Sequence, residues 1–365
     1  MESWPDPPAM QGTVVVIGGT GDVGGRLVRL LVNHSAARIL LVSRRAVGSS
    51  DRVKALRLDI AGKEATAKLP LDATVINLTE ATPPSVAVEI VGNGGSFLDT
   101  SASPDYVQAL RREVAGVGGP GTAVLCVGTA PGLSTLMAAE LVREIDAASA
   151  DVGLELGMGR HYGRAATEWS IGAIGRPYRL CSPGITVVRP GDLRRSFVFD
   201  RGGPARPALG IGFTVDGISD CSGSGPPVPV RTFVAIDPPF VTRAIGLLLR
   251  LGLGPVLSRR KRGVTRVLRW LPELGQSRVR IAVEAQNLGS RVAAARHVAT
   301  GDQADVTAAM ILATMRALPA VGRSIPGVTT IVDHLTFTMA LEALRHLLPG
   351  MEIETWSTGV EGEGP

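Results

Sequence analysis

The sequence has 365 residues, of which 45% are hydrophobic and 19% charged, so it describes neither a disordered nor a fibrous protein. That length suits one large or two ordinary globular domains. The formal net charge is +5, but no helix-turn-helix, zinc-finger or aromatic RNP pattern accompanies it, so we expect no nucleic-acid partner. The 3 cysteines are widely spaced and stand apart from histidines, so we expect a cytoplasmic protein without disulfides or a metal site.

The first predicted element is a β-branched strand at residues 13–17, which opens directly into a glycine-rich turn and then an amphipathic helix. Gly19, Gly21 and Gly24 satisfy the spacing GxGxxG. Such a turn brings backbone N–H groups close to a pyrophosphate, although an ordinary glycine-rich turn would look the same. We predict a dinucleotide site whose contacts include Gly18, Gly19, Thr20, Gly21, Asp22 and Val23.

The second predicted strand, residues 38–42, ends in Ser43, Arg44 and Arg45 and carries no acidic residue there. An aspartate or glutamate at this place would bind the ribose 2′-hydroxyl of NAD and repel a 2′-phosphate. A hydroxyl and guanidinium groups would instead hold that phosphate. The strand end therefore favours NADP(H), with a solvated arginine pair as the alternative.

Four further strands are predicted at residues 53–58, 73–78, 96–98 and 122–127, with helices between several of them. This alternation predicts an α/β fold with a Rossmann-type, doubly wound parallel sheet, whose ligands bind beyond the carboxyl ends of the strands. The polar residues at those ends complete the predicted cofactor site: Asp59, Glu80, Thr82 and Ser101. For Asp59 a simple turn aspartate is the alternative.

A strand predicted at residues 150–156 precedes the most polar cluster of the sequence, residues 157–164. Hydride transfer to a C=N, C=O or C=C bond benefits from a proton donor or an oriented cation. His161 and Tyr162 are the candidate catalytic acids, and Arg160 and Arg164 are candidates for binding a substrate carboxylate. The alternative for each is a hydrogen-bonded structural side chain.

Residues 239–257 form an apolar segment, which a basic and amphipathic one follows up to residue 271. Such a pair can rest on an anionic membrane surface or dock an acidic acyl-carrier protein, while a helical subdomain or dimer surface is the alternative. Further along, residues 278–285 and 290–298 predict a hairpin, residues 307–317 and 332–347 predict helices, and Gly327 marks a turn.

Several segments resemble the saccharopine dehydrogenase family of NADP-dependent reductases: residues 14–25, Ser43–Arg44, residues 97–100 and above all Gly128–Ser134 with its Pro-Gly-Leu. Looser similarities at residues 163–167 and 301–308 imply a substrate-binding role for Thr167. The resemblance implies an NADP-binding Rossmann domain at 1–130, a substrate-binding and dimerisation α+β domain at 131–302, and a helical segment at 303–365 that packs back on the first domain. It also implies a homodimer and a small-molecule substrate.

The leading hypothesis is an NADPH-dependent oxidoreductase that reduces the C=N bond of an imine, as the resemblance suggests. One alternative is a trans-acting enoyl (C=C) reductase of a carrier- or lipid-linked chain. Another is a catalytically silent NADP-binding scaffold. A short-chain dehydrogenase set is absent, because Tyr106, Tyr162 and Tyr178 have no lysine four residues later.

Overall fold

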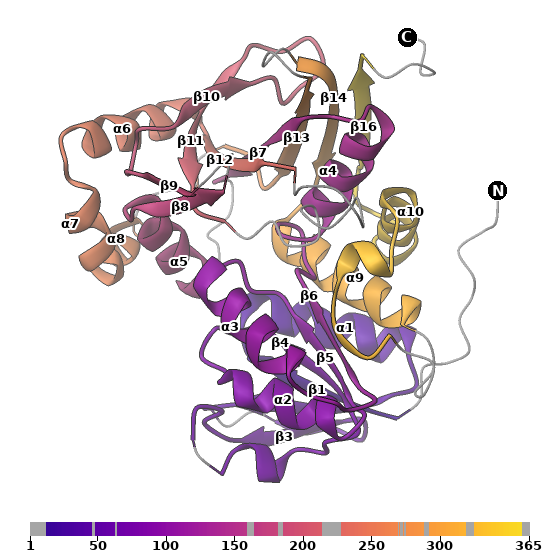
Figure 1. Ribbon diagram of the computed structural model, residues 1–365. Helices are drawn as coiled ribbons and strands as arrows, with labels where there is room; N and C mark the ends of the chain where they lie inside the picture. Colours follow the sequence, from indigo (N-terminus) through magenta and orange to yellow (C-terminus); the bar gives the residue numbers. More distant parts are fainter. Residues whose placement is uncertain are drawn as a thin grey trace. The chain divides into compact units, whose positions relative to one another are not determined.

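The computed structural model describes residues 12–45, 48–62, 64–158, 164–181, 185–213, 228–268, 270, 273, 275–287, 292–318 and 325–359. They belong to two compact units, which Figure 1 draws as ribbons. The first unit contains residues 12–136 and 304–350 of the described chain, and the second contains most of what lies between them together with the C-terminal strand.

The first unit is built on a seven-stranded sheet in the order β15-β6-β5-β4-β1-β2-β3, with every pairing parallel. The strands are β1 (Thr13–Ile17), β2 (Arg38–Ser43), β3 (Val53–Arg57), β4 (Thr74–Asn77), β5 (Ser96–Asp99), β6 (Thr122–Leu125) and β15 (Gly327–Thr330). The order reverses at β1, which confirms the predicted doubly wound, Rossmann-type sheet. The central strands are buried on both faces, so they show as continuous apolar runs.

The helices of this unit are α1 (Asp22–His34), α2 (Pro84–Gly92), α3 (Pro104–Ala115), α9 (Gln303–Ala317) and α10 (Phe337–Leu347). Short 3-10 turns occur at Thr66–Lys68 and Ile331–Asp333. The inner sides of α2 and α3 share one apolar core with the sheet, in which Ile90 and Leu110 meet Val75 and Phe97. By contrast, α9 has 11 buried residues out of 15, so it is a core helix rather than an amphipathic one.

Two predictions for the C-terminal region are wrong in part. Residues 327–330 form strand β15, which pairs with β6, and not merely a turn. The segment 303–365 is predicted to be helical and to pack back on the first domain, but its β16 (Glu354–Thr358) is a strand that pairs with β14 in the sheet of the second unit. These short strands lack the length and the alternation that would reveal them, so only their pairing partners define them.

The second unit contains another seven-stranded sheet, in the order β10-β11-β12-β7-β13-β14-β16. Its strands are β7 (Ser149–Gly157), β10 (Arg194–Phe197), β11 (Arg206–Ile211), β12 (Val230–Asp237), β13 (Val279–Gln286), β14 (Val292–Thr300) and β16. Only β12 and β7 pair in parallel, so the sheet is mixed, and the predicted hairpin is β13–β14. The other elements are α4 (Leu133–Glu144), of which residues 137–144 belong to this unit, α5 (Arg164–Ile174), α6 (Pro239–Arg250), α7 (Gly254–Arg259), α8 (Lys261–Leu268) and the hairpin β8 (Tyr178–Cys181)–β9 (Ile185–Val188).

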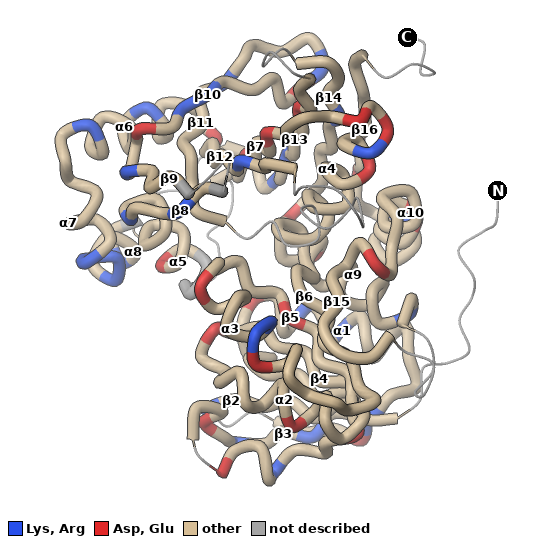
Figure 2. Tube along the Cα trace, in the orientation of Figure 1, with Lys and Arg blue, Asp and Glu red and all other residues tan. Residues whose placement is uncertain are grey.

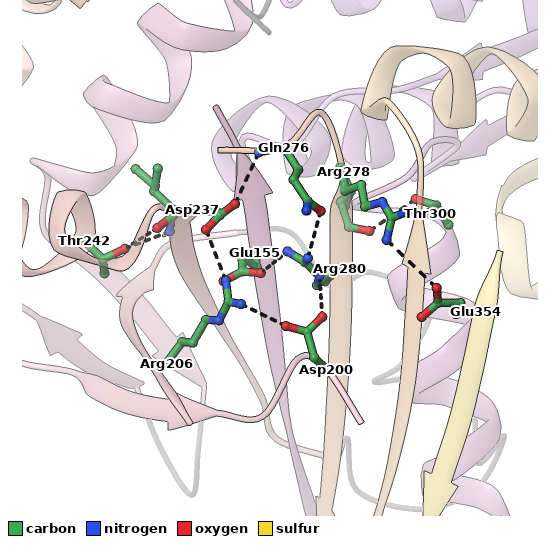
Figure 3. A network of polar contacts seen from close by, with 12 residues as sticks. Glu155, Asp200, Arg206, Asp237, Thr242, Gln276, Arg278, Arg280, Thr300 and Glu354 are labelled. Carbon is green, nitrogen blue, oxygen red and sulfur yellow. Dashed lines mark hydrogen bonds and ion pairs between the residues drawn. The ribbon is translucent and has the colours of Figure 1, made fainter. Parts of the chain in front are cut away.

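A buried ionic network crosses this second sheet (Figure 3). Glu155, on the central strand β7, is 1% exposed and accepts hydrogen bonds from Arg206 at 2.8 Å and from Arg280 at 2.7 Å. Arg206 also contacts Asp200 at 2.9 Å and Asp237 at 3.2 Å. Charges removed from water in this way must be paired, so the network fixes β7, β11 and β13 relative to each other. Within the described residues, no helix has the length and hydropathy needed to cross a membrane.

Candidate cofactor site

The glycine turn after β1 is tight. Gly18 has a φ of +83°, in the left-handed region that favours glycine. Its N–H donates to the carbonyl of Val42 at 3.1 Å, and the N–H of Gly21 donates to the carbonyl of Gly18 at 3.0 Å. The chain therefore leaves the sheet beside β2 and enters α1 within four residues.

Close packing explains why glycine occupies positions 19 and 24 of this turn. A Cβ placed on Gly24 would lie 2.5 Å from Cα of Gly19, and a Cβ on Gly19 would lie 2.7 Å from Cγ of Leu41. Side chains at either position would push α1 away from the sheet. Helix α1 begins after Gly21, which has no side chain to cap it. The first turn of a helix can bind an anion through its backbone N–H groups. These residues fit the pyrophosphate of a dinucleotide.

Asp22 and Thr20 make contacts that hold this turn in place. The Asp22 carboxylate accepts from Nε of Arg26 at 3.3 Å, and Arg26 also pairs with Asp305 at the beginning of α9. The Thr20 hydroxyl lies 3.2 Å from that of Ser43. The turn is thus fixed both to its own helix and to the end of β2.

The end of β2 presents positive charge to solvent. Arg44 and Arg45 are exposed, and within residues 38–45 there is no acidic side chain. Ser43 is buried, and its hydroxyl accepts from the N–H of Arg45 at 3.0 Å, so Ser43 shapes this loop. The phosphate contact that the sequence predicts for Ser43, Arg44 and Arg45 stays a prediction.

Asp59 follows β3, the edge strand of the sheet, and is exposed. Its carboxylate accepts from the N–H of Ala61 at 3.2 Å, and its carbonyl accepts from the N–H of Gly62 at 3.0 Å. These bonds make a local turn. The adenine contact that the sequence predicts for Asp59 stays a prediction.

The loops after β4 and β5 are joined by a buried polar network centred on Asn77. Its Nδ2 donates to Asp99 at 2.6 Å and to the Tyr106 hydroxyl at 3.1 Å, and its Oδ1 accepts from the Thr82 hydroxyl at 2.6 Å. The Tyr106 hydroxyl in turn donates to the carbonyl of Thr82 at 2.7 Å. Every polar group of the Asn77 side chain has a partner, so the network is well ordered.

Asp99 is the fully buried acid of this network. Its carboxylate accepts from the N–H and from the hydroxyl of Ser101, each at 3.0 Å. Burial raises the pKa of Asp99 to about 6, although the hydrogen bonds from Asn77 and Ser101 oppose that change. Burial, assisted by the charge of Asp99, also raises the pKa of Tyr106, which therefore stays protonated.

Three of the predicted cofactor contacts lie in these loops. Glu80 accepts from the N–H of Ser103 at 3.0 Å and from its hydroxyl at 2.6 Å, while Thr82 and Ser101 belong to the Asn77 network. Their side chains thus position the loops at the carboxyl edge of the sheet. Sequence reasoning missed Asn77 and the role of Tyr106, since one asparagine ending a strand resembles any turn residue.

The Pro-Gly-Leu segment lies against α9. Gly132 has a φ of +137°, and the hydroxyl of Thr129 lies 2.9 Å from that of Thr307. Both hydroxyls are buried. Two segments that resemble the same family, 178 residues apart in sequence, are therefore neighbours within the first unit.

Of the predicted catalytic and substrate-binding residues, Arg164 and Thr167 belong to the second unit. Arg160, His161 and Tyr162 lie outside the described residues. Arg164 begins α5 and Thr167 follows one turn later on that helix. All five stay predictions. Among the described residues, no three His, Cys, Asp or Glu side chains gather as they would around a metal ion.

The chain is similar to known proteins in part of its sequence and in its fold. Residues 12–81 match the family model of the KR domain, whereas a comparison with curated protein sequences gives no match. Saccharopine dehydrogenase (L-Glu forming) from Saccharomyces cerevisiae has a TM-score of 0.57 and 12% identity, over 95% of this chain and 99% of its own. A meso-DAPDH mutant with DAP from Clostridium tetani has a TM-score of 0.44 and 13% identity, over 92% and 99%. Dihydrodipicolinate reductase from Paenisporosarcina sp. TG-14 has a TM-score of 0.41 and 10% identity, over 89% and 100%.

The likeness to the yeast enzyme extends over nearly all of both chains, so it confirms the fold that the sequence resemblance implies. The KR match covers the glycine turn and strands β1 to β4, and it supports binding of NAD(P) without distinguishing NAD from NADP. The chain therefore has the architecture of an NAD(P)-dependent oxidoreductase, with a Rossmann unit and a second unit on a mixed sheet.

Proposed function

We propose that this protein is an NADPH-dependent reductase that acts on the C=N bond of an imine in a small metabolite. The observation that carries the proposal is the full-length fold of a saccharopine dehydrogenase, joined to a glycine turn whose packing admits no side chain at Gly19 or Gly24. The imine is the part that rests on family resemblance.

The preference for NADPH rests on the end of β2. A 2′-phosphate carries up to two negative charges, and the exposed guanidinium of Arg44 offers it a bidentate partner. An aspartate or glutamate that would select the free 2′-hydroxyl is absent there. The buried Ser43 holds the loop that carries Arg44 and Arg45.

Within this proposal each group has a defined task. The bound nicotinamide supplies the hydride. The first turn of α1 and the glycine turn hold the pyrophosphate, and the Asn77 network keeps the two neighbouring loops in place. His161 or Tyr162 donates a proton to the nitrogen of the substrate, while Arg160 and Arg164 bind its carboxylate and Thr167 contacts it.

The test is a titration of the purified protein with NADPH and with NADH, followed by measurement of NADPH consumption with three groups of compounds. These are cyclic imines, amines mixed with 2-oxo acids, and enoyl thioesters. Turnover of imines, lost in His161→Ala or Tyr162→Phe, supports the proposal. Turnover of enoyl thioesters alone identifies a C=C reductase instead, and tight NADPH binding without any turnover identifies a scaffold.

A further inference from the structure

The helices α6, α7 and α8 of the second unit carry charged side chains of one sign only. From Pro239 to Trp270 the sequence contains 8 basic residues and no acidic residue. Figure 2 shows α7 and α8 at one end of the second unit, with their basic residues in blue. Arg259, Arg260, Lys261, Arg262 and Gly263 line a concavity of about 510 Å³ on this surface.

The same surface exposes large apolar side chains along α6. Phe240 and Leu247 are each 58% exposed, and Leu251, directly after the helix, is 66% exposed. Their spacing of seven and four residues places them on one side of the helix. The opposite side carries Thr242, Gly246 and Leu249, which are buried where α6 packs on the sheet. The exposed apolar side chains of α6 therefore do not pack into the core of the unit. Arg243 and Arg250, which are both exposed, lie beside them.

The apolar surface continues on α7 and α8. Val256 is 52% exposed, Val267 is 64% exposed, and Trp270 just beyond α8 is 87% exposed. Arg262 and Arg266 are exposed on α8 as well, whereas Thr265 between them is buried. A tryptophan with this exposure leaves a large ring in water, and such rings are enriched where proteins meet lipid headgroups.

We propose that this basic and apolar surface, made of α6, α7, α8 and Trp270, binds an anionic lipid membrane without crossing it. A membrane surface accepts scattered apolar side chains at the headgroup boundary and attracts arginine through its negative potential. Both features are present together over three successive helices, without a single carboxylate to repel the lipid.

Two other occupants fit less well. A second copy of the chain would bring this surface against itself in a symmetric dimer, so its arginines would face arginines. An acidic protein would satisfy the charges, but Phe240, Leu247, Val256, Val267 and Trp270 are spread along several helices instead of forming one hot spot at the centre of a patch. A lipid surface requires no such centre.

The experiment is flotation of the full chain with vesicles of phosphatidylcholine alone and of phosphatidylcholine mixed with phosphatidylglycerol. We expect the protein to float with the anionic vesicles only, and to be released as the salt concentration rises. The emission of Trp270 should shift to the blue on binding and be quenched by brominated lipids, and Trp270→Phe should remove that part of the signal.

Three double variants separate the causes. Leu247→Ser with Leu251→Ser removes apolar contacts, and Arg262→Glu with Arg266→Glu reverses charges on the surface. Arg112→Glu with Arg345→Glu is the matched control, because both arginines are exposed on helices of the first unit and the net charge changes equally. We expect each surface variant to lower vesicle binding about tenfold or more, and the control to change it little.

Affinity for NADPH and the circular dichroism spectrum, measured on every variant, show that folding is intact, so this test is independent of the proposed reaction. The proposal is overturned if the protein does not bind anionic vesicles at low salt, or if the control loses binding as strongly as the surface variants. Binding to an acidic carrier protein without binding to vesicles also overturns it.

Discussion

The guanidinium of Arg44 is exposed directly after the buried Ser43, at the strand end where the ribose of a dinucleotide lies in this fold. Replacing Arg44 by aspartate removes a charge-assisted hydrogen bond to the 2′-phosphate of NADPH, worth about 1.5–3 kcal/mol, and puts a negative charge beside that phosphate. We expect Arg44→Asp to weaken NADPH binding at least about tenfold and to leave NADH binding nearly unchanged. Arg38→Asp, at the other end of the same strand, is the control in a fluorescence titration. An unchanged affinity for NADPH in Arg44→Asp would show that the 2′-phosphate lies elsewhere.

Two adjacent glycines in α1 test the close packing of the turn. A methyl group on Gly24 meets the backbone of Gly19, whereas one on Gly25 meets nothing within 4 Å. We expect Gly24→Ala to lower the free energy of unfolding by about 1–3 kcal/mol and to impair dinucleotide binding. Gly25→Ala should raise it by about 0.5–1 kcal/mol, because alanine favours a helix. Urea denaturation of both variants, with NADPH titrations, distinguishes the two positions; equal effects would contradict the packing argument.

The buried carboxyl of Asp99 predicts a pH dependence of stability. Its pKa of about 6 in the folded chain exceeds the ordinary value of 3.8, so the folded state holds the proton more tightly. The stabilisation is complete below pH 3.8 and is lost as the pH rises through 6. Since one pH unit corresponds to about 1.4 kcal/mol, the loss amounts to about 3 kcal/mol.

The Asp99→Asn variant has no carboxyl group to titrate at this position. Between pH 4 and 7 the free energy of unfolding of the wild type should therefore fall relative to that of the variant, by up to about 3 kcal/mol. Guanidinium denaturation of both proteins at several pH values measures the difference. A difference that stays constant with pH would mean that folding does not raise the pKa of Asp99.

Among single residues, the sequence reveals those that are needed for their small size or for their charge, such as Gly24 and Arg44. It does not reveal Asn77, whose importance comes from three partners on different loops. Tyr106 is similar, since its partners Asn77 and Thr82 lie 29 and 24 residues away. A pattern of residue types along the sequence does not show which side chains far apart in the chain form hydrogen bonds with each other.

Arg280, on β13, and Arg278, directly before that strand, allow a buried ion pair to be compared with a surface ion pair. Arg280 is 5% exposed and is bound to Glu155, whereas Arg278 pairs at the surface with Glu352 and Glu354. Removing one partner of a buried pair leaves an unpaired charge. We expect Arg280→Ala to cost about 3–5 kcal/mol in unfolding free energy. Arg278→Ala should cost less than about 1 kcal/mol, and similar costs in urea denaturation would contradict this reading of the network.

Among the elements, the parallel strands other than β15 and the β13–β14 hairpin are predicted almost at their observed bounds. Strands buried on both faces require continuous apolar residues, so β1 and β4 stand out in the sequence. Strands β10 and β11 do not, because the charged residues Arg195 and Arg206 lie on them and are neutralised by acids on other strands. The apolar segment predicted from residue 239 is two helices, since the chain leaves α6 through Gly252 with a φ of +75°.

At the scale of the whole molecule, the first unit depends on a segment that follows the second in sequence. Residues 304–350 supply α9, α10 and the edge strand β15. We expect a chain ending at residue 302 to lose NADPH binding and cooperative unfolding, because the almost fully buried α9 would be missing. A chain ending at residue 350 lacks only β16 and its neighbours, so it should still bind NADPH. Binding by the shorter chain would contradict the dependence.

This arrangement also bears on synthesis by the ribosome. Thr122 of β6 and Gly327 of β15 are 205 residues apart, yet they pair along one edge of the sheet. At about 5–20 residues per second, about 10–40 s pass between the translation of the two strands. During that time β6 presents an unpaired edge, which is a template for association between nascent chains. A chaperone that shields this edge until α9 and β15 emerge would therefore raise the yield of active protein, and slowed translation beyond residue 300 would lower it.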